Sequence, residues 1–295
     1  TDTLTTLLST WPELLVATWE GKISVYTNYQ ENTSSPFTLW FESSPAVTGW
    51  VSMLNAADFD HDGIPEIFVG RQVFGFDFTN PAAPTLTRKL AGANHSGGPP
   101  GAGSGFLDVS AAADILSKAD CNGDPDCDGL ELAAGAYIYS VDLDVSDGDG
   151  LQIKVQRNLN QLAPGANYSD GFTQIADINL DGTPDVVVNG VKNLLTKPVD
   201  GIYVWDKNGL ISFLPMYPSV NWKAWGKLTI ANVFDDRKAG FAQDFPEIIG
   251  KQADSMRLAA FSLHAQTLNS AQPFWWEAPS DDESTNCFVT AFDFN

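Results

Sequence analysis

Short apolar runs, separated by turns rich in Asp, Gly and Pro, recur along the whole chain. In many runs, such as residues 22–26 and 201–205, apolar and polar side chains alternate, and aromatic and β-branched residues are frequent. A period of two predicts half-buried strands, whereas the helical period of about 3.6 residues is weak throughout. The pattern therefore predicts an all-β chain of short strands.

One longer pattern repeats: an apolar strand, the loop D-x-[DN]-x-D-G-x-P-[DE], and a second apolar strand. The loop is intact at residues 58–66 and 177–185, and degenerate copies begin at Asp114, Asn232 and Asp293. The first positions, 58, 114, 177, 232 and 293, are 56, 63, 55 and 61 residues apart. Residues 12–17 match residues 65–70, the second half of a copy, with no acidic loop before them.

Each repeat contains about four predicted strands, and the strand before each loop is expected at residues 50–54, 106–110, 172–175, 227–230 and 288–291. Four short antiparallel strands in about 55–60 residues are typical of a β-propeller blade. A β-solenoid has shorter repeats, and an immunoglobulin-like array needs roughly 90–100 residues per unit. We therefore predict a single β-propeller domain, or a propeller fragment, over residues 1–295 with five visible repeats.

The intact loops offer oxygen ligands at positions 1, 3, 5 and 9 and a main-chain carbonyl at position 7, and glycine at position 6 permits the turn. Ca²⁺ accepts roughly six to eight hard oxygens in irregular geometry, whereas Mg²⁺ needs a stricter octahedron. The predicted ligands of the first ion are Asp58, Asp60, Asp62, the carbonyl of Ile64, and Glu66; those of the second are Asp177, Asn179, Asp181, the carbonyl of Thr183, and Asp185.

Two other interpretations of these loops exist. An EF-hand shares the first half of the motif, but it needs flanking helices and a Glu at position 12. Val69 and Val188 occupy that position here, inside apolar strands, so the EF-hand interpretation fails. The remaining alternative is an Asp-Gly β-turn without metal, in which clustered carboxylates would repel one another.

The degenerate copies are less regular. The copy that begins at Asp114, called the third loop below, contains an excess of acids, and we expect a third ion there. Its candidate ligands are Asp114, Asp124, Asp126, Asp128 and Glu131. Cys121 and Cys127 flank this acidic stretch and predict a local disulfide, the alternative being two free thiols. In the fourth copy, Asp235, Asp236 and Asp244 remain as candidate ligands.

Charge and composition argue against several classes of function. The chain has 16 Lys and Arg against 37 Asp and Glu, a net charge of −21, which argues against a nucleic-acid partner. No run approaches the roughly 18 apolar residues of a membrane span. The motifs G-x-S-x-G and H-E-x-x-H are absent, and no residue is assigned a catalytic role.

The repeated loops and their spacing resemble the FG-GAP/VCBS repeats of integrin α-chain propellers, some fungal lectins and large bacterial surface proteins, and are most similar to secreted cell-surface proteins of Bacteroidota. The resemblance implies a secreted, calcium-binding propeller. Propellers of this kind commonly have about seven blades. Either the N-terminal strands and residues 287–295 share one blade of a five-bladed ring, or the chain is a piece of something larger; we favour the piece.

Ligands of such propellers usually bind the loops that connect blades. Two of these loops repeat each other, and the candidate ligand-binding residues are Asn94, His95, Ser96, Asn167, Tyr168 and Ser169. Amide, hydroxyl and aromatic groups suit sugars, but the same residues also cap turns. We predict an adhesion or ligand-binding module with a glycan or protein ligand, joined to other domains of a larger chain. The alternatives are a polysaccharide lyase or hydrolase and a structural spacer.

Overall fold

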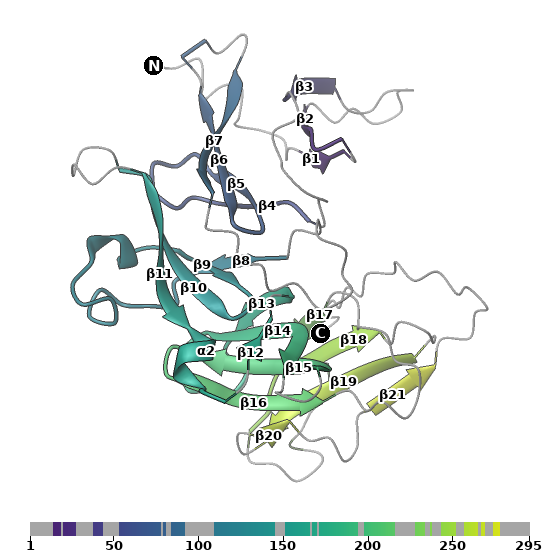
Figure 1. Cartoon of the computed structure of the whole chain (residues 1–295). Helices are drawn as coiled ribbons and strands as arrows, with labels where there is room; N and C mark the ends of the chain where they lie inside the picture. Colours follow the sequence, from purple (N-terminus) through teal and green to yellow (C-terminus); the bar gives the residue numbers. More distant parts are fainter. Residues whose placement is uncertain are drawn as a thin grey trace. The chain divides into compact units, whose positions relative to one another are not determined.

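The computed structural model is all-β, and the strands of its described residues form five sheets (Figure 1). The described residues are 14–18, 20–27, 38–43, 53–77, 79–80, 84–91, 109–144, 151–165, 167–169, 171–193, 198–215, 228–233, 237, 243–251, 257–264, 267–268 and 274–277. The chain divides into two compact units, which are described separately: the first comprises residues 1–93, 103–107 and 142–153, and the second comprises residues 94–102, 108–141 and 154–295.

Two sheets make up the first unit. One has the order β1-β2-β3, with β1 (Leu14–Ala17), β2 (Ile23–Thr27) and β3 (Thr38–Glu42). The other has the order β4-β5-β6-β7, with β4 (Asn55–Ala57), β5 (Glu66–Val69), β6 (Gln72–Asp77) and β7 (Thr85–Ala91). The two sheets share a core, in which Ile23 of the first packs with Ile67, Val69 and Phe74 of the second.

Three sheets make up the second unit. The first of them contains β8 (Ala111–Ala113), β9 (Glu131–Ala134), β10 (Tyr137–Asp142) and β11 (Gln152–Asn158), although Asp142 and residues 152–153 fall within the bounds of the first unit. The next contains β12 (Asn167–Tyr168), β13 (Phe172–Ala176), β14 (Asp185–Asn193), β15 (Pro198–Asp206) and β16 (Gly209–Pro215). The last contains β17 (Leu228–Ala231), β18 (Glu247–Lys251), β19 (Arg257–His264), β20 (Thr267–Leu268) and β21 (Phe274–Glu277).

Helical structure among the described residues is confined to single turns. A 3₁₀ turn, η1 (Pro125–Cys127), lies in the loop between β8 and β9, and the short α2 (Leu159–Leu162) follows β11. No helix of the described residues is both long and apolar enough to cross a membrane.

The fourth sheet, β12 to β16, is packed on both faces. In β14, Val186 and Val188 enter one core with Trp205 of β15 and side chains of the third sheet. Val187, which lies between them, enters the other core with Ile248 of the fifth sheet. Because successive side chains of a strand point to opposite faces, a strand covered on both sides must be apolar at every position. This explains the three consecutive valines, residues 186–188, within β14.

The prediction of an all-β chain built from repeated four-stranded antiparallel sheets of the propeller type is confirmed. The strands before the first and third Asp loops comprise Asn55–Ala57 and Ala111–Ala113. Of the ranges predicted for them, residues 53–54 and 109–110 are not strand, and residues 50–52 and 106–108 lie outside the described residues. These strands consist largely of alanine, which gives no alternation to read. Two further first strands agree to within one residue, and the one expected at 288–291 lies outside the described residues.

Candidate metal centres

The two intact Asp loops have closely similar backbone turns. One joins β4 to β5 and the other joins β13 to β14. At position 4 the backbone angle φ is positive, 56° at His61 and 59° at Leu180, and at position 6 it is 87° at both Gly63 and Gly182. A residue with a side chain is strained at such angles, so the Asp-Gly step of the motif meets a requirement of the turn.

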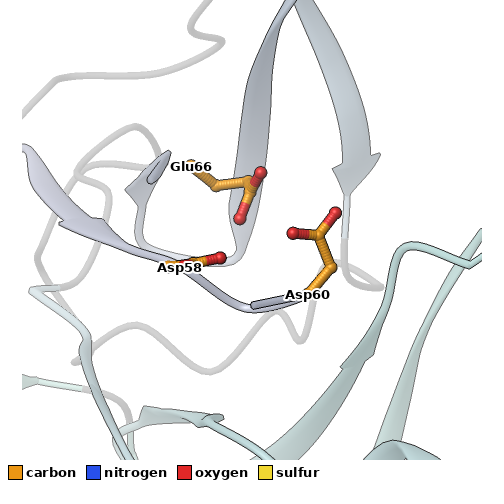
Figure 2. Close-up of side chains that lie close together, drawn as sticks. All are labelled: Asp58, Asp60 and Glu66. Carbon is orange, nitrogen blue, oxygen red and sulfur yellow. The ribbon is translucent and has the colours of Figure 1, made fainter. Parts of the chain in front are cut away.

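In the first loop, three carboxylates converge. Oxygen atoms of Asp58, Asp60 and Glu66 all lie within 4.8 Å of one another, and Figure 2 shows the three side chains turned toward a common space. Main-chain hydrogen bonds orient two of them: the Gly63 N–H donates to Asp58 Oδ2 at 3.0 Å, and the Phe59 N–H donates to Glu66 Oε2 at 3.0 Å. The loop therefore holds a set of oxygens that suits a hard cation.

Asp62, another predicted ligand of this loop, is not part of the three-carboxylate cluster and accepts a main-chain hydrogen bond from Ile64, whose carbonyl is the predicted ligand at position 7. The Ile64 N–H donates to Asp62 Oδ1 at 2.7 Å, and the Asp62 N–H donates to Asp60 Oδ1 at 3.2 Å. These bonds close the turn on its outer side, where Asp62 is exposed.

The carboxylates of the first loop carry charge that the described residues do not neutralise. Burial raises the pKa of Glu66 to about 7, the hydrogen bond from Phe59 offsets this only in part, and the charges of Asp60 and Asp62 raise it further. Burial also raises the pKa of Asp60. Asp58 Oδ1 is buried and accepts no hydrogen bond from a described residue. A divalent cation would remove all three penalties.

The second loop has the same backbone turn, but its three carboxylates do not all come within 4.8 Å of one another. Asp177 accepts the N–H groups of Asp181 at 3.0 Å and Gly182 at 2.8 Å, and the Asn179 amide donates to Asp181 Oδ2 at 3.1 Å. Asp185 is fully buried, and its Oδ1 accepts no hydrogen bond from a described residue. Burial raises the pKa of Asp185 to about 7, and the charges of Asp181 and Asp177 add to the effect.

One bond of the first loop recurs in the second, whereas one ligand differs. The Thr183 N–H donates to Asp181 Oδ1 at 2.8 Å, as the Ile64 N–H does to Asp62 in the first loop, and this bond lowers the pKa of Asp181. Asn179 at position 3 replaces an acid, so this loop has one carboxylate fewer than the first. Among the described residues, three carboxylates come within 4.8 Å of one another in the first loop alone.

The acid at position 9 is a candidate metal ligand, and it also forms a main-chain hydrogen bond that the sequence alone does not reveal. Each acid lies opposite an alanine of the preceding strand, in the pairs Ala57–Glu66, Ala113–Glu131, Ala176–Asp185 and Ala231–Glu247. Each also accepts the N–H of the residue two places after that alanine, from Phe59 at 3.0 Å, Ile115 at 2.7 Å, Ile178 at 2.9 Å and Val233 at 2.8 Å. The acid therefore closes the hairpin in all four repeats, and its persistence in the degenerate copies is the signal that sequence reasoning missed.

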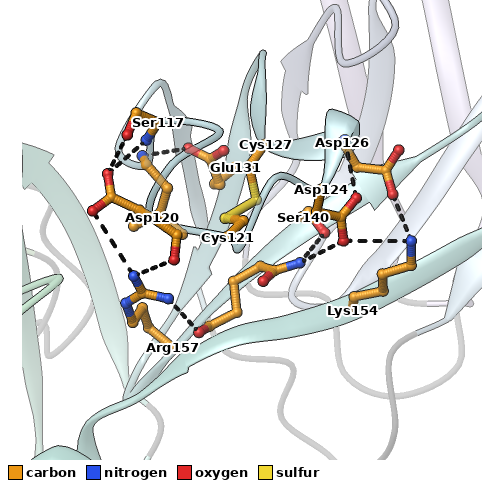
Figure 3. Close-up of a disulfide and its surroundings, with 12 residues drawn as sticks. Ser117, Asp120, Cys121, Asp124, Asp126, Cys127, Glu131, Ser140, Lys154 and Arg157 are labelled. Carbon is orange, nitrogen blue, oxygen red and sulfur yellow. Dashed lines mark hydrogen bonds and ion pairs between the residues drawn. A yellow bond between two sulfur atoms is a disulfide. The ribbon is translucent and has the colours of Figure 1, made fainter.

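The third loop does not assemble the predicted ligands into one cluster. Asp124 and Asp126 both face Lys154, whose Nζ is 3.5 Å from Asp124 Oδ2 and 2.8 Å from Asp126 Oδ2 (Figure 3). Asp114 and Asp128 are exposed. Glu131 is fully buried, and burial raises its pKa to about 7. Of the five predicted ligands, two therefore contact a lysine, one forms the hairpin bond described above, and two are exposed.

A disulfide links Cys121 and Cys127, whose Cα atoms are 6.3 Å apart, and both residues are buried. In the fourth loop, Asp244 lies 3.5 Å from the Arg237 guanidinium, while Asp235 and Asp236 lie outside the described residues.

The candidate ligand-binding loops are only partly described. Asn94, His95 and Ser96 lie outside the described residues, whereas Asn167 is exposed and Tyr168 and Ser169 are buried. The ring of Tyr168 packs 5.0 Å from that of Tyr203, and the Asn160 side chain binds both the N–H and the carbonyl of Tyr168. Tyr168 therefore serves the core, and Asn167 alone of these three offers its side chain to solvent.

Repeated antiparallel sheets, in which an Asp loop connects two neighbouring strands of the same sheet, define the chain as a β-propeller-type module. Residues 10–69 match the model of the FG-GAP-like repeat, so the chain carries a repeat of that family. The match begins upstream of β1 and ends with the last residue of β5, and it includes the first intact loop. No curated protein matches the chain.

Proposed function

We propose that the chain is an extracellular, calcium-binding β-propeller module that presents a ligand-binding surface for adhesion. The observation that carries the calcium assignment is the convergence of Asp58, Asp60 and Glu66 within 4.8 Å. Three carboxylates at this separation repel one another, and two of them have raised pKa values through burial. A bound cation converts this repulsion into a cross-link between β4 and β5.

Calcium fits the donor set better than other common metals. The candidate ligands are carboxylate, amide and carbonyl oxygens. None of them is Cys or His, the residues that Zn²⁺ and Cu²⁺ prefer as ligands. The loops mix rigid main-chain turns with side chains of different length. That irregularity suits Ca²⁺ and penalises Mg²⁺, which needs near-octahedral geometry.

Two features support an extracellular location. Disulfides persist in oxidising compartments, and the Cys121–Cys127 bond lies in the interior of a loop. The FG-GAP-like repeat at residues 10–69 fits the same setting.

The adhesion role rests on the expectation that ligands bind the loops that connect the sheets, where Asn167 is exposed, and it is tested by ligand screening. The purified chain, with calcium, is applied to a glycan array and to immobilised matrix proteins. Chelator-sensitive binding to either supports the proposal. Release of unsaturated sugars from acidic polysaccharides would instead identify a lyase, and absence of both activities would favour a structural spacer.

Isothermal titration calorimetry is expected to show two calcium ions per chain, one for each intact loop. Asp60→Asn keeps the acceptor for the Asp62 N–H but removes one charge from the first cluster, so it should weaken the first site by about tenfold or more. Glu20→Gln is the control, because the Glu20 side chain is 72% exposed and outside both loops. Titration heats that are the same for both variants would contradict the assignment.

Calcium affinity should depend on pH, because protons compete for Glu66 and Asp185, whose pKa values are about 7 without metal. A folded-state pKa above the unfolded value means that the metal-free fold is favoured at low pH, and that this advantage disappears as the pH rises toward about 7. Calcium needs the ionised acids, so its affinity changes in the opposite sense. We expect the dissociation constant of each loop to rise about tenfold between pH 8 and pH 6. A constant that does not change over this interval would refute the competition.

A further inference from the structure

The third repeat has lost the D-x-D-x-D-G order but has kept its acids, and the structure shows what these acids bind. Lys154, on β11, lies against Asp124 and Asp126, and its side chain is 27% exposed. Gln156, on the same strand, donates to Asp124 Oδ2 at 3.2 Å and to Ser140 Oγ at 2.9 Å. The two acids therefore share one ammonium group, and both accept hydrogen bonds or ion pairs from side chains of β11.

The other end of the loop is held in the same way. Asp120 Oδ2 accepts a hydrogen bond from Lys207 Nζ at 2.9 Å and from the Ser117 hydroxyl at 2.6 Å. These bonds hold the pKa of Asp120 well below its usual range. Arg157 Nη2 donates to the main-chain carbonyl of Asp120 at 2.6 Å, and Arg157 Nε donates to the carbonyl of Lys207 at 3.2 Å.

These contacts join two sheets. Lys154 and Arg157 belong to β11 of the third sheet, while Lys207 lies in the turn between β15 and β16 of the fourth. Arg157 thus ties the main chain of the third loop to the main chain of the next sheet. Figure 3 shows the disulfide between the two groups of charges, with Asp120 and Arg157 on one side and Asp124, Asp126 and Lys154 on the other.

We propose that Lys154, Arg157 and Lys207 take the place of the divalent cation in the third repeat, so that this loop is held, and fastened to the fourth sheet, without calcium. A calcium ion at Asp124 and Asp126 would have to displace the Lys154 ammonium and leave it half-buried beside a second cation. The main chain also differs from that of the intact loops, since Asn122 and Gly123 form a turn closed by the Asp124 N–H to the Cys121 carbonyl at 3.1 Å.

The disulfide makes this arrangement workable. A divalent ion can bind several side chains at one point, whereas Lys154 contacts only two carboxylates. The rest of the loop therefore needs another constraint. Cys121–Cys127 supplies it covalently, and the main-chain bonds of Gly123, Asp124 and Asp128 complete it. The contrast with the loops at 58–66 and 177–185 rests on the proposed calcium function, but the role of Lys154 does not.

Amide hydrogen exchange of the full chain tests the proposal, with calcium and with a chelator. Chelation should raise exchange about tenfold in residues 58–66 and 177–185, and by less than about twofold in residues 117–128. Lys154→Met should raise exchange in residues 117–128 about tenfold whether or not calcium is present. Lys154→Arg, which keeps the charge, should leave it near the original value.

Lys118→Met is the matched control, because Lys118 is an exposed lysine of the same loop. Residues 58–66 act as an internal check that each variant is folded. If Lys118→Met and Lys154→Met are indistinguishable, or if chelation opens residues 117–128 as much as the intact loops, the proposal is wrong. If instead chelation affects none of the three loops while Lys154→Met still raises exchange in residues 117–128, the calcium assignment is wrong and the proposed role of Lys154 is supported.

Discussion

Chelation of calcium is expected to lower the midpoint of thermal unfolding by about 10–20 °C in the first unit and by about 5–10 °C in the larger second unit. A ligand present at about 100 times its dissociation constant stabilises the folded state by about 2.7 kcal/mol, and each kcal/mol corresponds to about 4–8 °C in a domain of roughly 100 residues but to about 2–4 °C in one of roughly 150–250 residues. One intact loop, 58–66, lies in the first unit and the other, 177–185, lies in the second. Both units should therefore melt at a lower temperature, and differential scanning calorimetry with and without chelator measures the change.

Variants assign this effect to individual loops. Asp58→Asn removes a carboxylate from the first cluster and should abolish the calcium response of the first unit alone. Asp177→Asn should do the same in the second unit. Magnesium at the same concentration should restore little of the loss, because the loop oxygens do not form a strict octahedron. Unfolding that is the same with calcium and with chelator would exclude a stabilising ion at both loops.

Replacement of Trp205 by alanine is expected to cost about 3–5 kcal/mol of unfolding free energy, the largest effect of any single substitution considered in the second unit. Trp205 is fully buried in the core shared by the third and fourth sheets. Its indole N–H donates to the carbonyl of Gly135 at 3.1 Å. The substitution therefore leaves a cavity and a buried carbonyl without its donor. Urea unfolding followed by far-ultraviolet circular dichroism measures the loss.

A graded control separates packing from hydrogen bonding. Trp205→Phe keeps most of the apolar volume but loses the bond to Gly135, so it should cost about 1–3 kcal/mol. Leu180→Ala changes a side chain that is 40% exposed in the second Asp loop, and it should cost little. An alanine variant at 205 that unfolds at the same urea concentration as Leu180→Ala would show that this core is not essential to the unit.

The sequence predicts the architecture well because the repeat carries two independent signals. The interval between Asp loops sets the size of a blade, and the apolar runs that flank each loop mark the strands packed between neighbouring sheets. Residues 186–188 illustrate the second signal, since all three valines are buried and serve two different cores. The short strands of alanine before the loops escape prediction because alanine has no strong preference for strands.

The candidate sites are predicted less completely, and the reason is physical. Ligand order within a loop is local, so Asp58, Asp60 and Glu66 can be found by spacing alone. The partner of Asp124 and Asp126 is not local, because Lys154 lies on another strand, 28 residues after Asp126. Tyr168 is a similar case: its sequence context is typical of a sugar-binding turn, but the Asn160 side chain and Tyr203 draw it into the core.

The acid that closes each hairpin has a consequence for how such chains change over time. One of its oxygens holds the main chain through a bond that needs no ion, and in Glu247 the second oxygen accepts a bond from the Ser262 hydroxyl at 3.0 Å. Mutation can then erase the other acids of a loop while the two strands stay in register. The hairpin of each repeat therefore does not depend on whether that repeat retains the full set of candidate metal ligands.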